Sequence, residues 1–169
     1  MKEKKDQKTT WKEIGHTDLR DLDQSRKLPD EEVIQSQDSA ELALTILEYH
    51  LGFVKLAISE VAVETPIGSV LIERKNLSHI IEKRQDARER YVKHALATMR
   101  DPFEVWLVAY EDEMGNEEHR YAYIGAFKGK KQMLVVFTNV NGKLLWNFMH
   151  GDNKALNKHR HGECVYSRL

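Results

Sequence analysis

The residues best suited to chemistry lie between positions 76 and 94, in the stretch NLSHIIEKRQDARERYVKH. His79 comes first, and Arg84 and Arg88 follow four residues apart, so the two arginines share a face if this stretch is helical. The planar guanidinium of arginine matches two phosphoryl oxygens, and a histidine with a pKa near neutrality exchanges protons at pH 7. The pattern fits a proton-transfer residue beside a phosphate clamp. The alternative is an ordinary surface helix that carries ion pairs.

Positive charge is concentrated at the C-terminal end of the chain. The whole sequence holds 26 Lys and Arg against 27 Asp and Glu, whereas residues 128–169 hold 8 against 2. A phosphate-bearing partner favours such an end, because each phosphate that is neutralised releases counterions. The alternative is an exposed, lysine-rich sheet edge that its charge keeps soluble and unpaired.

The basic end also contains His159, His161 and the single cysteine, Cys164. With His150 and Asp152 nearby these residues could form a zinc cluster, but their spacing matches no familiar ligand pattern. We therefore expect a solvated basic loop and no metal site. A lone cysteine excludes an internal disulfide, and no activating base is evident beside it, so a cysteine nucleophile is not expected.

An antiparallel sheet is predicted for the C-terminal half. Turn residues separate apolar runs at residues 103–111, 119–127, 131–140 and 144–149, with a candidate fifth strand at 162–167. Two-residue turns would set the following residues opposite each other: Arg120 and Asn139, Ala122 and Phe137, and Phe137 and Trp146. One sheet face is then apolar, with Arg120 and Asn139 at its open end.

The other face of the predicted sheet is aromatic. Its residues are Tyr121, Tyr123, Phe127 and Thr138. Lys128 and Lys131 lie close by, so the aromatic rings could stack on RNA bases while the lysines hold the backbone. The alternative is that these rings cover a second hydrophobic layer.

Helices and a hairpin are predicted ahead of this sheet. Asp38 and Glu41 have the spacing of a capping box for a helix over residues 39–51, which Gly52 ends. Strands are predicted over 53–65 and 68–73, and a second helix runs from Asp86 to Asp101–Pro102. The polar residues 1–38 form an arm or linker before a single domain over 39–169. The fold class is α+β, with N-terminal helices packed on a curved antiparallel sheet of four to five strands.

Nucleotide-fuelled and dinucleotide chemistry is not expected, because the sequence patterns typical of it are absent. The sequence contains neither of the glycine-rich phosphate loops GxxxxGK[ST] and GxGxxG, and it contains no GxSxG nucleophile elbow. No stretch approaches the roughly 18 apolar residues that cross a membrane, and no apolar region follows the charged N-terminus as in a secretory signal. We expect a cytoplasmic protein with no membrane partner.

Five segments together resemble the phage-associated branch of the barnase, EndoU, colicin and RelE-like nuclease superfamily. They are NLSHIIEKRQDARERY, DPFEVWLVAYED, RYAYIGAF, MLVVFTNVNGKLLWNF and NKHRHGECVY, within residues 60–166. Domains of this branch often follow a Mu-type head-morphogenesis module. No such module precedes the match, so the chain is expected to be a stand-alone protein or an excised C-terminal domain.

The resemblance implies a metal-independent ribonuclease without a cofactor, in which the 2′-hydroxyl of RNA attacks the adjacent phosphate and leaves a cyclic phosphate. Carried over by motif, His79 is the general base or acid, Arg88 and Arg120 are phosphate clamps, and Thr138 or Tyr166 positions the substrate. Residues expected to contact RNA are Arg84, Lys128, Lys131, Lys158 and Arg160. Such a site requires that His79, Arg88 and Arg120 approach one cleft.

Three functions follow as hypotheses. The first is an RNA-cleaving toxin or effector of a phage or mobile element, with an immunity protein as a candidate partner. The second is a non-enzymatic head-assembly or adaptor domain that binds a phage structural protein and keeps the nuclease fold. The third is a nucleic-acid binder without catalysis.

Overall fold

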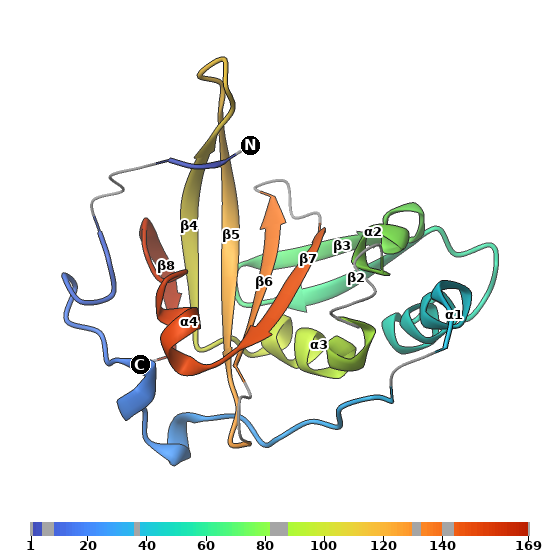
Figure 1. The fold of residues 1–169 in the computed structure, drawn as a ribbon, viewed down its shortest axis with the longest axis horizontal. Helices are drawn as coiled ribbons and strands as arrows, with labels where there is room; N and C mark the ends of the chain where they lie inside the picture. The colour runs from blue at the N-terminus through green and yellow to red at the C-terminus, as the bar shows by residue number, and fades with distance from the viewer. Residues whose placement is uncertain are drawn as a thin grey trace.

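The structure is a computed structural model of the 169-residue chain (Figure 1). It describes residues 2–4, 9–35, 38–81, 88–129, 133–139 and 144–168. No helix in these ranges is long and apolar enough to cross a membrane.

The centre of the molecule is an antiparallel sheet. Its meander is β4 (Glu104–Glu111), β5 (Glu117–Ala126), β6 (Met133–Asn139) and β7 (Leu144–Gly151). The free edge of β4 pairs with β8 (Glu163–Ser167) over one half and with β1 (Lys2–Glu3) near the other end. The α+β class and the fifth strand are confirmed, whereas β1 gives no strand pattern in the sequence.

The pairing of β5 with β6 follows the predicted register. Arg120 lies opposite Asn139, as the turn geometry predicted. The prediction for β7 was wrong: Val136 lies opposite Phe148 and Thr138 opposite Leu144, with a register shift between Val136 and Thr138. The regular ladder that would set Trp146 opposite Phe137 is interrupted at that shift, because β7 advances four residues there while β6 advances two.

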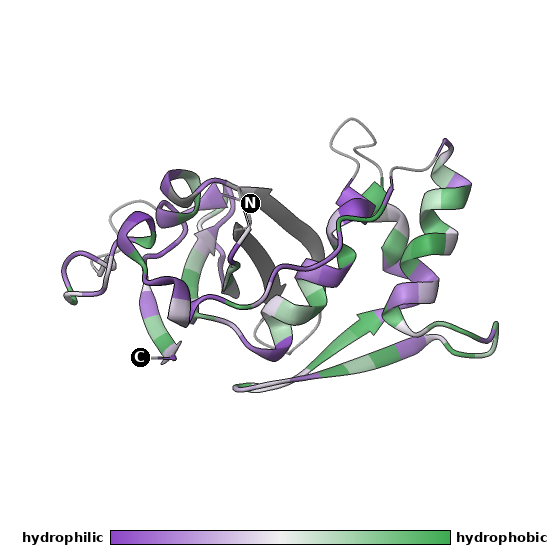
Figure 2. Ribbon diagram, turned by 90° about the horizontal axis from the view of Figure 1, so that it is seen from below, coloured by the Kyte–Doolittle hydropathy of each residue, from purple (hydrophilic) through white to green (hydrophobic). Residues whose placement is uncertain are grey.

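One face of the sheet, which we call the helix-facing side, is covered by helices and a hairpin (Figure 1). These elements are α1 (Ala40–Leu51), α2 (Leu77–Ile81), the 3-10 turn η5 (Arg88–Tyr91), α3 (Val92–Arg100), β2 (Glu60–Thr65) and β3 (Gly68–Glu73). Tyr123 and Phe127 are buried here, so the aromatic face forms a hydrophobic layer and is closed to RNA bases. Hydrophobic residues colour much of α1 and the hairpin (Figure 2).

Two local predictions on this side needed correction. Helix α1 is capped by Ser39, whose hydroxyl accepts from the Leu42 amide at 3.1 Å, one residue later than the predicted cap at Asp38. Residues 53–59 are irregular and not a strand, because the Arg74 guanidinium donates to the carbonyl oxygens of Phe53, Lys55 and Leu56 at 2.8–3.1 Å.

The opposite face, which we call the arm-facing side, is covered by the N-terminal arm and α4 (Asn153–Asn157). The arm contains the 3-10 turns η1 (Leu19–Asp21) and η2 (Gln24–Arg26). Leu19, Leu22 and Leu156 pack with Trp106 and neighbouring apolar residues into a second core. Residues 9–35 therefore pack against the sheet, although the arm is mostly hydrophilic (Figure 2).

Candidate nucleic-acid interface

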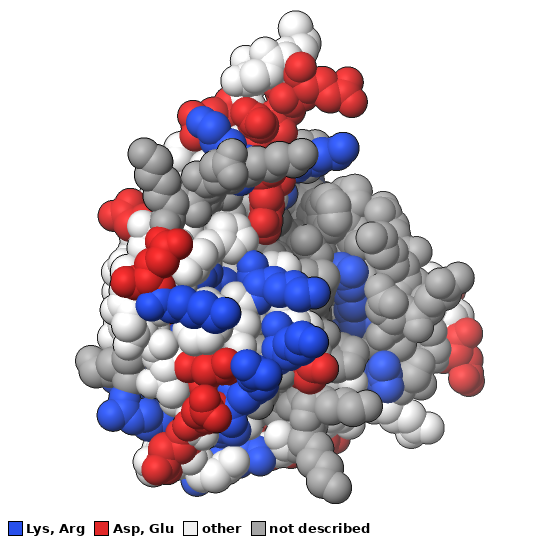
Figure 3. All heavy atoms as spheres, turned by 60° about the vertical axis from the view of Figure 1, so that its left-hand side comes forward, with Lys and Arg blue, Asp and Glu red and all other residues white. Residues whose placement is uncertain are grey.

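A basic pocket of about 570 Å³ opens on the arm-facing side, between the arm, α4 and the residues before β8. We call it the basic pocket, and it is lined by Lys4, Thr10, Trp11, Lys12, Arg20, Lys154, Asn157, Lys158, Arg160 and His161. Lys and Arg side chains gather on this side of the molecule (Figure 3). The pocket contains cations, an aromatic ring and a histidine, which is the combination that holds a polynucleotide backbone.

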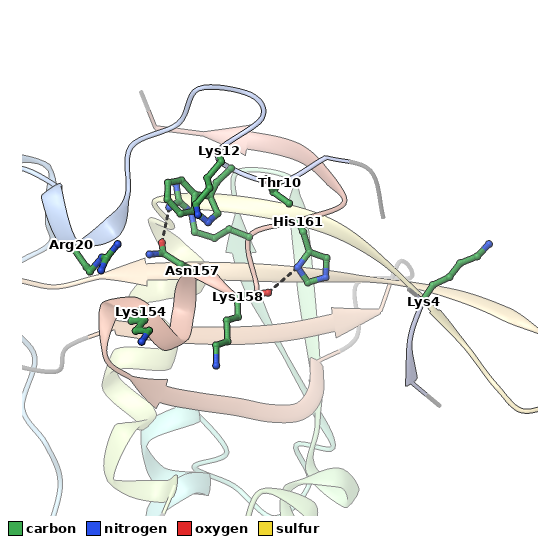
Figure 4. Close-up of a pocket in the computed structure, with 10 residues that line it drawn as sticks. Lys4, Thr10, Lys12, Arg20, Lys154, Asn157, Lys158 and His161 are labelled. Atoms are coloured by element: carbon green, nitrogen blue, oxygen red, sulfur yellow. Dashed lines mark hydrogen bonds between the residues drawn. The ribbon is translucent and has the colours of Figure 1, made fainter. Parts of the chain in front are cut away.

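Helix α4 and its C-terminal cap residue each supply one lysine to the pocket. Asp152 caps the helix, with a carboxylate oxygen that accepts from the Ala155 amide at 2.8 Å, and buried Leu156 anchors it to the core. Lys154 and Lys158 are four residues apart, so they project from the same side of this turn, as Figure 4 shows.

These two lysines and Lys12 are exposed cations without a carboxylate partner among the described residues. The Lys12 ammonium lies 5.4 Å from the centre of the Trp11 ring. Phosphate groups could therefore pair with these three lysines without first breaking an ion pair.

The floor of the pocket is a buried ion pair between Arg160 and Glu104. Arg160 Nε and Nη2 donate to the two Glu104 carboxylate oxygens at 2.5 and 3.0 Å, and both side chains are fully buried. The Trp106 indole donates to Glu104 at 3.1 Å, and His16 bonds the same carboxylate. The sequence predicted an RNA contact for Arg160, but the structure buries its guanidinium and commits it to Glu104.

A chain of hydrogen bonds joins this floor to the pocket wall. Arg160 Nη1 donates to Asn157 Oδ1 at 3.0 Å, and Asn157 Nδ2 donates to Asp18 at 2.8 Å. Asp18 in turn pairs with Arg20 at 2.7 Å, and the Arg20 guanidinium beside it holds the pKa of that carboxyl well below its usual range. The Arg20 charge is thus fixed in place at the pocket rim.

His161 lies in the wall of the pocket with both ring nitrogens engaged. Nδ1 is 2.8 Å from the carbonyl oxygen of Lys158, and Nε2 is 3.1 Å from a carboxylate oxygen of Glu3 in β1. The hydrogen bond to Glu3 raises the pKa of His161. Burial lowers the pKa of the neighbouring His159, so the two histidines are shifted in opposite directions.

Four of the residues that the sequence proposed for catalysis belong to the helix-facing side. His79 lies in α2 and half-buried Arg88 in η5, two elements that contact each other. Tyr166 packs against the helix-facing core from β8, and Thr138 pairs in the sheet with Tyr121, which packs against that core as well.

Arg120 lies on the arm-facing side instead. Its guanidinium is 4.4 Å from the centre of the Tyr110 ring and 3.2 Å from Glu118. The sheet therefore separates Arg120 from α2 and η5, and the three residues His79, Arg88 and Arg120 do not converge on one cleft.

The residues predicted to contact RNA are dispersed. Lys158 lines the basic pocket, and Lys128 is exposed at the end of β5, where its amide donates to the Leu28 carbonyl at 3.0 Å. Arg84 and Lys131 lie outside the described residues. Lys12, Lys154, Asn157 and Trp11 were not predicted as site residues; the spacing of Lys154 and Lys158 was the available signal.

One group of potential metal ligands occurs among the described residues: His16, Glu104 and Cys164, with donor atoms within 4.8 Å of one another. Both Glu104 oxygens already accept hydrogen bonds from Arg160. Burial raises the pKa of the Cys164 thiol to about 11, and the thiol donates to the Tyr166 carbonyl at 3.4 Å. This group fits a hydrogen-bonded network better than a cation site, because the thiolate that would bind a metal is disfavoured.

We compared the sequence with models of known protein families. The model of the family described as phage-Barnase-EndoU-ColicinE5/D-RelE like nuclease2 matches residues 50–167. The chain belongs to this family. The match runs from the end of α1 through β8 and includes α4, His161 and the buried pair of Glu104 and Arg160, whereas the arm residues of the pocket precede it. No curated protein and no solved structure matches the chain.

Proposed function

We propose that the chain is a metal-independent ribonuclease of a phage or mobile element, acting as a toxin or effector, and that it binds RNA in the basic pocket. The observation that carries the proposal is a group of three lysines beside Trp11 and His161, none with a carboxylate partner in the part of the chain that the structure describes, in a member of a phage-type nuclease family. Membership in the family supports a nucleic-acid substrate, and the lysines supply the charge that a phosphodiester backbone requires.

The reaction is a transphosphorylation within the RNA strand. A general base takes the proton of the 2′-hydroxyl, whose oxygen forms a bond to the adjacent phosphorus. The bond from phosphorus to the 5′-oxygen breaks, and a general acid protonates that oxygen. Lys12, Lys154 and Lys158 would stabilise the extra negative charge of the pentavalent phosphorane, so electrostatics and proton transfer suffice for the reaction.

The roles that the sequence assigned to His79, Arg88, Thr138 and Tyr166 remain predictions of a different arrangement. They would place the chemistry on the helix-facing side, with Arg84 as a contact to the RNA backbone. Arg120 stays a predicted phosphate clamp on the arm-facing side, where its guanidinium lies over the ring of Tyr110 and the Tyr110 hydroxyl donates to Glu3.

The proposed activity is tested by incubating purified protein with a pool of tRNA and rRNA in EDTA and analysing the product ends. We expect cleavage with 2′,3′-cyclic phosphates. The double variant Lys154→Ala/Lys158→Ala should lose about 30- to 900-fold in kcat/KM, because each of the two charge-assisted contacts contributes about 1–2 kcal/mol.

A matched control removes two exposed lysines away from the pocket, Lys55→Ala/Lys75→Ala, and should retain full activity. Folding of each variant is checked by thermal unfolding. Absence of cleavage by folded wild-type protein across several RNA classes would overturn the proposal.

A second candidate function is a non-enzymatic adaptor or head-assembly domain. Apolar side chains are exposed on α1 and in the loop that follows it: Leu42, Tyr49, Val54 and Leu56, the last with 94% of its surface accessible. Such a surface suits a protein partner, such as a phage structural protein or an immunity protein. Partner binding that is lost in Tyr49→Ser/Leu56→Ser, with no RNA cleavage by the wild type, would favour this role.

A further inference from the structure

His161 has the geometry of a proton donor whose reactive nitrogen is covered. A carbonyl oxygen only accepts hydrogen bonds, so Nδ1 must carry a proton to bond the Lys158 carbonyl at 2.8 Å. A carboxylate also only accepts, so Nε2 must carry a second proton to bond Glu3 at 3.1 Å. As an imidazolium, the ring donates both of its N–H groups to protein partners.

The two partners of the ring differ in how firmly they are held. Lys158 is three residues before His161, and the backbone between them is tied to the arm: the Arg160 carbonyl accepts from the Trp11 amide at 3.1 Å, and the Gly162 amide donates to Thr9 at 2.8 Å. The Nδ1 contact is therefore part of the local fold. It orients the ring and leaves Nε2 as the nitrogen available to a substrate.

Glu3, by contrast, is held by a short element. Strand β1 has two residues and pairs with Glu111 and Tyr110 at the sheet edge. The Glu3 side chain retains 37% exposure, and its second oxygen accepts from the Tyr110 hydroxyl at 3.3 Å. An edge element with so few contacts opens at a low free-energy cost.

Glu3 is an anion bonded to a residue of the basic pocket. Its carboxylate meets His161, and the pocket that His161 lines also contains Lys4, Lys12 and Lys158. An oxygen of an RNA phosphodiester carries the same charge and accepts the same hydrogen bond. RNA and Glu3 would therefore compete for Nε2.

We propose that His161 is the general acid of RNA cleavage and that Glu3 of β1 covers its reactive nitrogen until RNA displaces it. This inference rests on the proposed ribonuclease function and adds to it a catalytic residue and an autoinhibitory strand. When RNA is bound, the Nε2 proton passes to the 5′-oxygen as its bond to phosphorus breaks. His161 is left neutral and takes a proton from solvent before the next cycle.

The strand is tested with Glu3→Gln, which removes the charge and keeps the size, and with Glu113→Gln as a control at the exposed tip of the β4–β5 hairpin. The probe is a 2′-O-methyl RNA oligonucleotide, which binds but cannot be cleaved. We expect Glu3→Gln to bind this probe about 3- to 10-fold more tightly and to raise kcat/KM on unmodified RNA similarly. Unchanged affinity in Glu3→Gln would overturn the competition.

The acid is tested with His161→Gln and, if that variant unfolds, His161→Asn. A lost general acid lowers kcat about 10²- to 10⁴-fold, whereas affinity for the 2′-O-methyl probe should stay within about threefold. Normal kcat in a folded variant would overturn the catalytic role. If wild-type protein binds the probe but cleaves no RNA, the ribonuclease proposal and the acid role fail together, while tighter binding by Glu3→Gln still establishes the covering strand.

Discussion

At the scale of single residues, burial decides what a charged group can do. Arg160 belongs to the basic C-terminal end, and the family resemblance predicted that it contacts RNA. Its partner Glu104 stands 56 residues earlier and meets it only when β8 pairs with β4. No local pattern in the sequence predicts this ion pair. The sequence could identify a basic end, but not which of its cations the fold would use internally.

The ion pair leads to a prediction about stability. In Arg160→Met the Glu104 carboxylate remains buried without its cation, so we expect the free energy of unfolding to fall by about 3–5 kcal/mol. The double variant Glu104→Gln/Arg160→Met should recover part of this loss, because neither charge is then buried. Urea unfolding of Arg160→Met, Glu104→Gln and the double variant measures the coupling between the two residues. Strictly additive losses of stability would contradict it.

The pair of Glu3 and His161 predicts a pH window. Its hydrogen bond raises the pKa of His161 above the ordinary value of 6.5 and lowers that of Glu3 below 4.5. His161, whose pKa is raised, contributes its full stabilisation of the folded state below pH 6.5, and this contribution is lost as pH rises through its folded-state pKa. Glu3, whose pKa is lowered, contributes its full stabilisation above pH 4.5, and this contribution is lost as pH falls through its folded-state pKa.

The ion pair between Glu3 and His161 should therefore be fully formed between pH 4.5 and pH 6.5. NMR titration of the His161 ring in wild type and Glu3→Gln measures the window. We expect a lower His161 pKa in the variant, and equal values would show that the contact is not formed in solution.

At the scale of elements, the close approach of α3 to β5 depends on Gly125. A Cβ atom at this position would lie 2.1 Å from Thr98 Oγ1 and 3.0 Å from Phe127 Cε2. Thr98 is fully buried in α3, so it has little room to withdraw. The absence of a side chain at position 125 thus sets how closely the helix packs on the sheet.

We expect Gly125→Ala to lower the free energy of unfolding by about 1–3 kcal/mol through overpacking. Gly151→Ala is the matched control in the same sheet, because its added Cβ would meet Ala155 at an ordinary 3.5 Å. Thermal and urea unfolding of the two variants gives the comparison. A Gly125→Ala protein as stable as the control would mean that α3 packs less closely than described.

The elements also show which features a sequence reveals. The register between β5 and β6 was predicted, because residue alternation is a local property. The irregular segment 53–59 was mistaken for a strand, since the Arg74 guanidinium that binds its carbonyl groups is distant in sequence. Helix α2 was missed because five residues are too few for a periodic pattern.

At the scale of the whole molecule, the fold separates charge. The basic C-terminal end lies beside Lys12 and Arg20 of the arm, so two regions that are distant in sequence form one pocket. The acidic residues of the β4–β5 hairpin gather at its tip, away from this pocket (Figure 3). The overall charge of −1 therefore conceals a surface that would attract a polyanion.

RNA binding should consequently weaken with salt. Three lysines that neutralise three phosphates of a single strand predict a slope of about −2 for log K against log salt concentration. The slope for Lys154→Ala/Lys158→Ala should be smaller by about 1.4. Fluorescence anisotropy of a labelled 2′-O-methyl oligonucleotide at several salt concentrations measures both values, and equal slopes would place the RNA elsewhere.

The whole fold also explains why the site was harder to predict than the architecture. His79, Arg88 and Arg120 share suitable chemistry in the sequence, but the sheet lies between the first two and the third. Which face a strand residue occupies follows from alternation, whereas which face a helix covers depends on the complete topology. The basic pocket also needs the arm, whose polar sequence predicted a linker.

The most direct test of RNA cleavage at the basic pocket compares kcat/KM in EDTA for variants of the two faces. We expect Lys154→Ala/Lys158→Ala to lose about 30- to 900-fold, from about 1–2 kcal/mol for each of two contacts, while His79→Ala/Arg88→Ala, if folded, stays within about threefold of wild type. The opposite result, with full activity in the lysine variant and loss in the other, would contradict this location and place the chemistry on the helix-facing side.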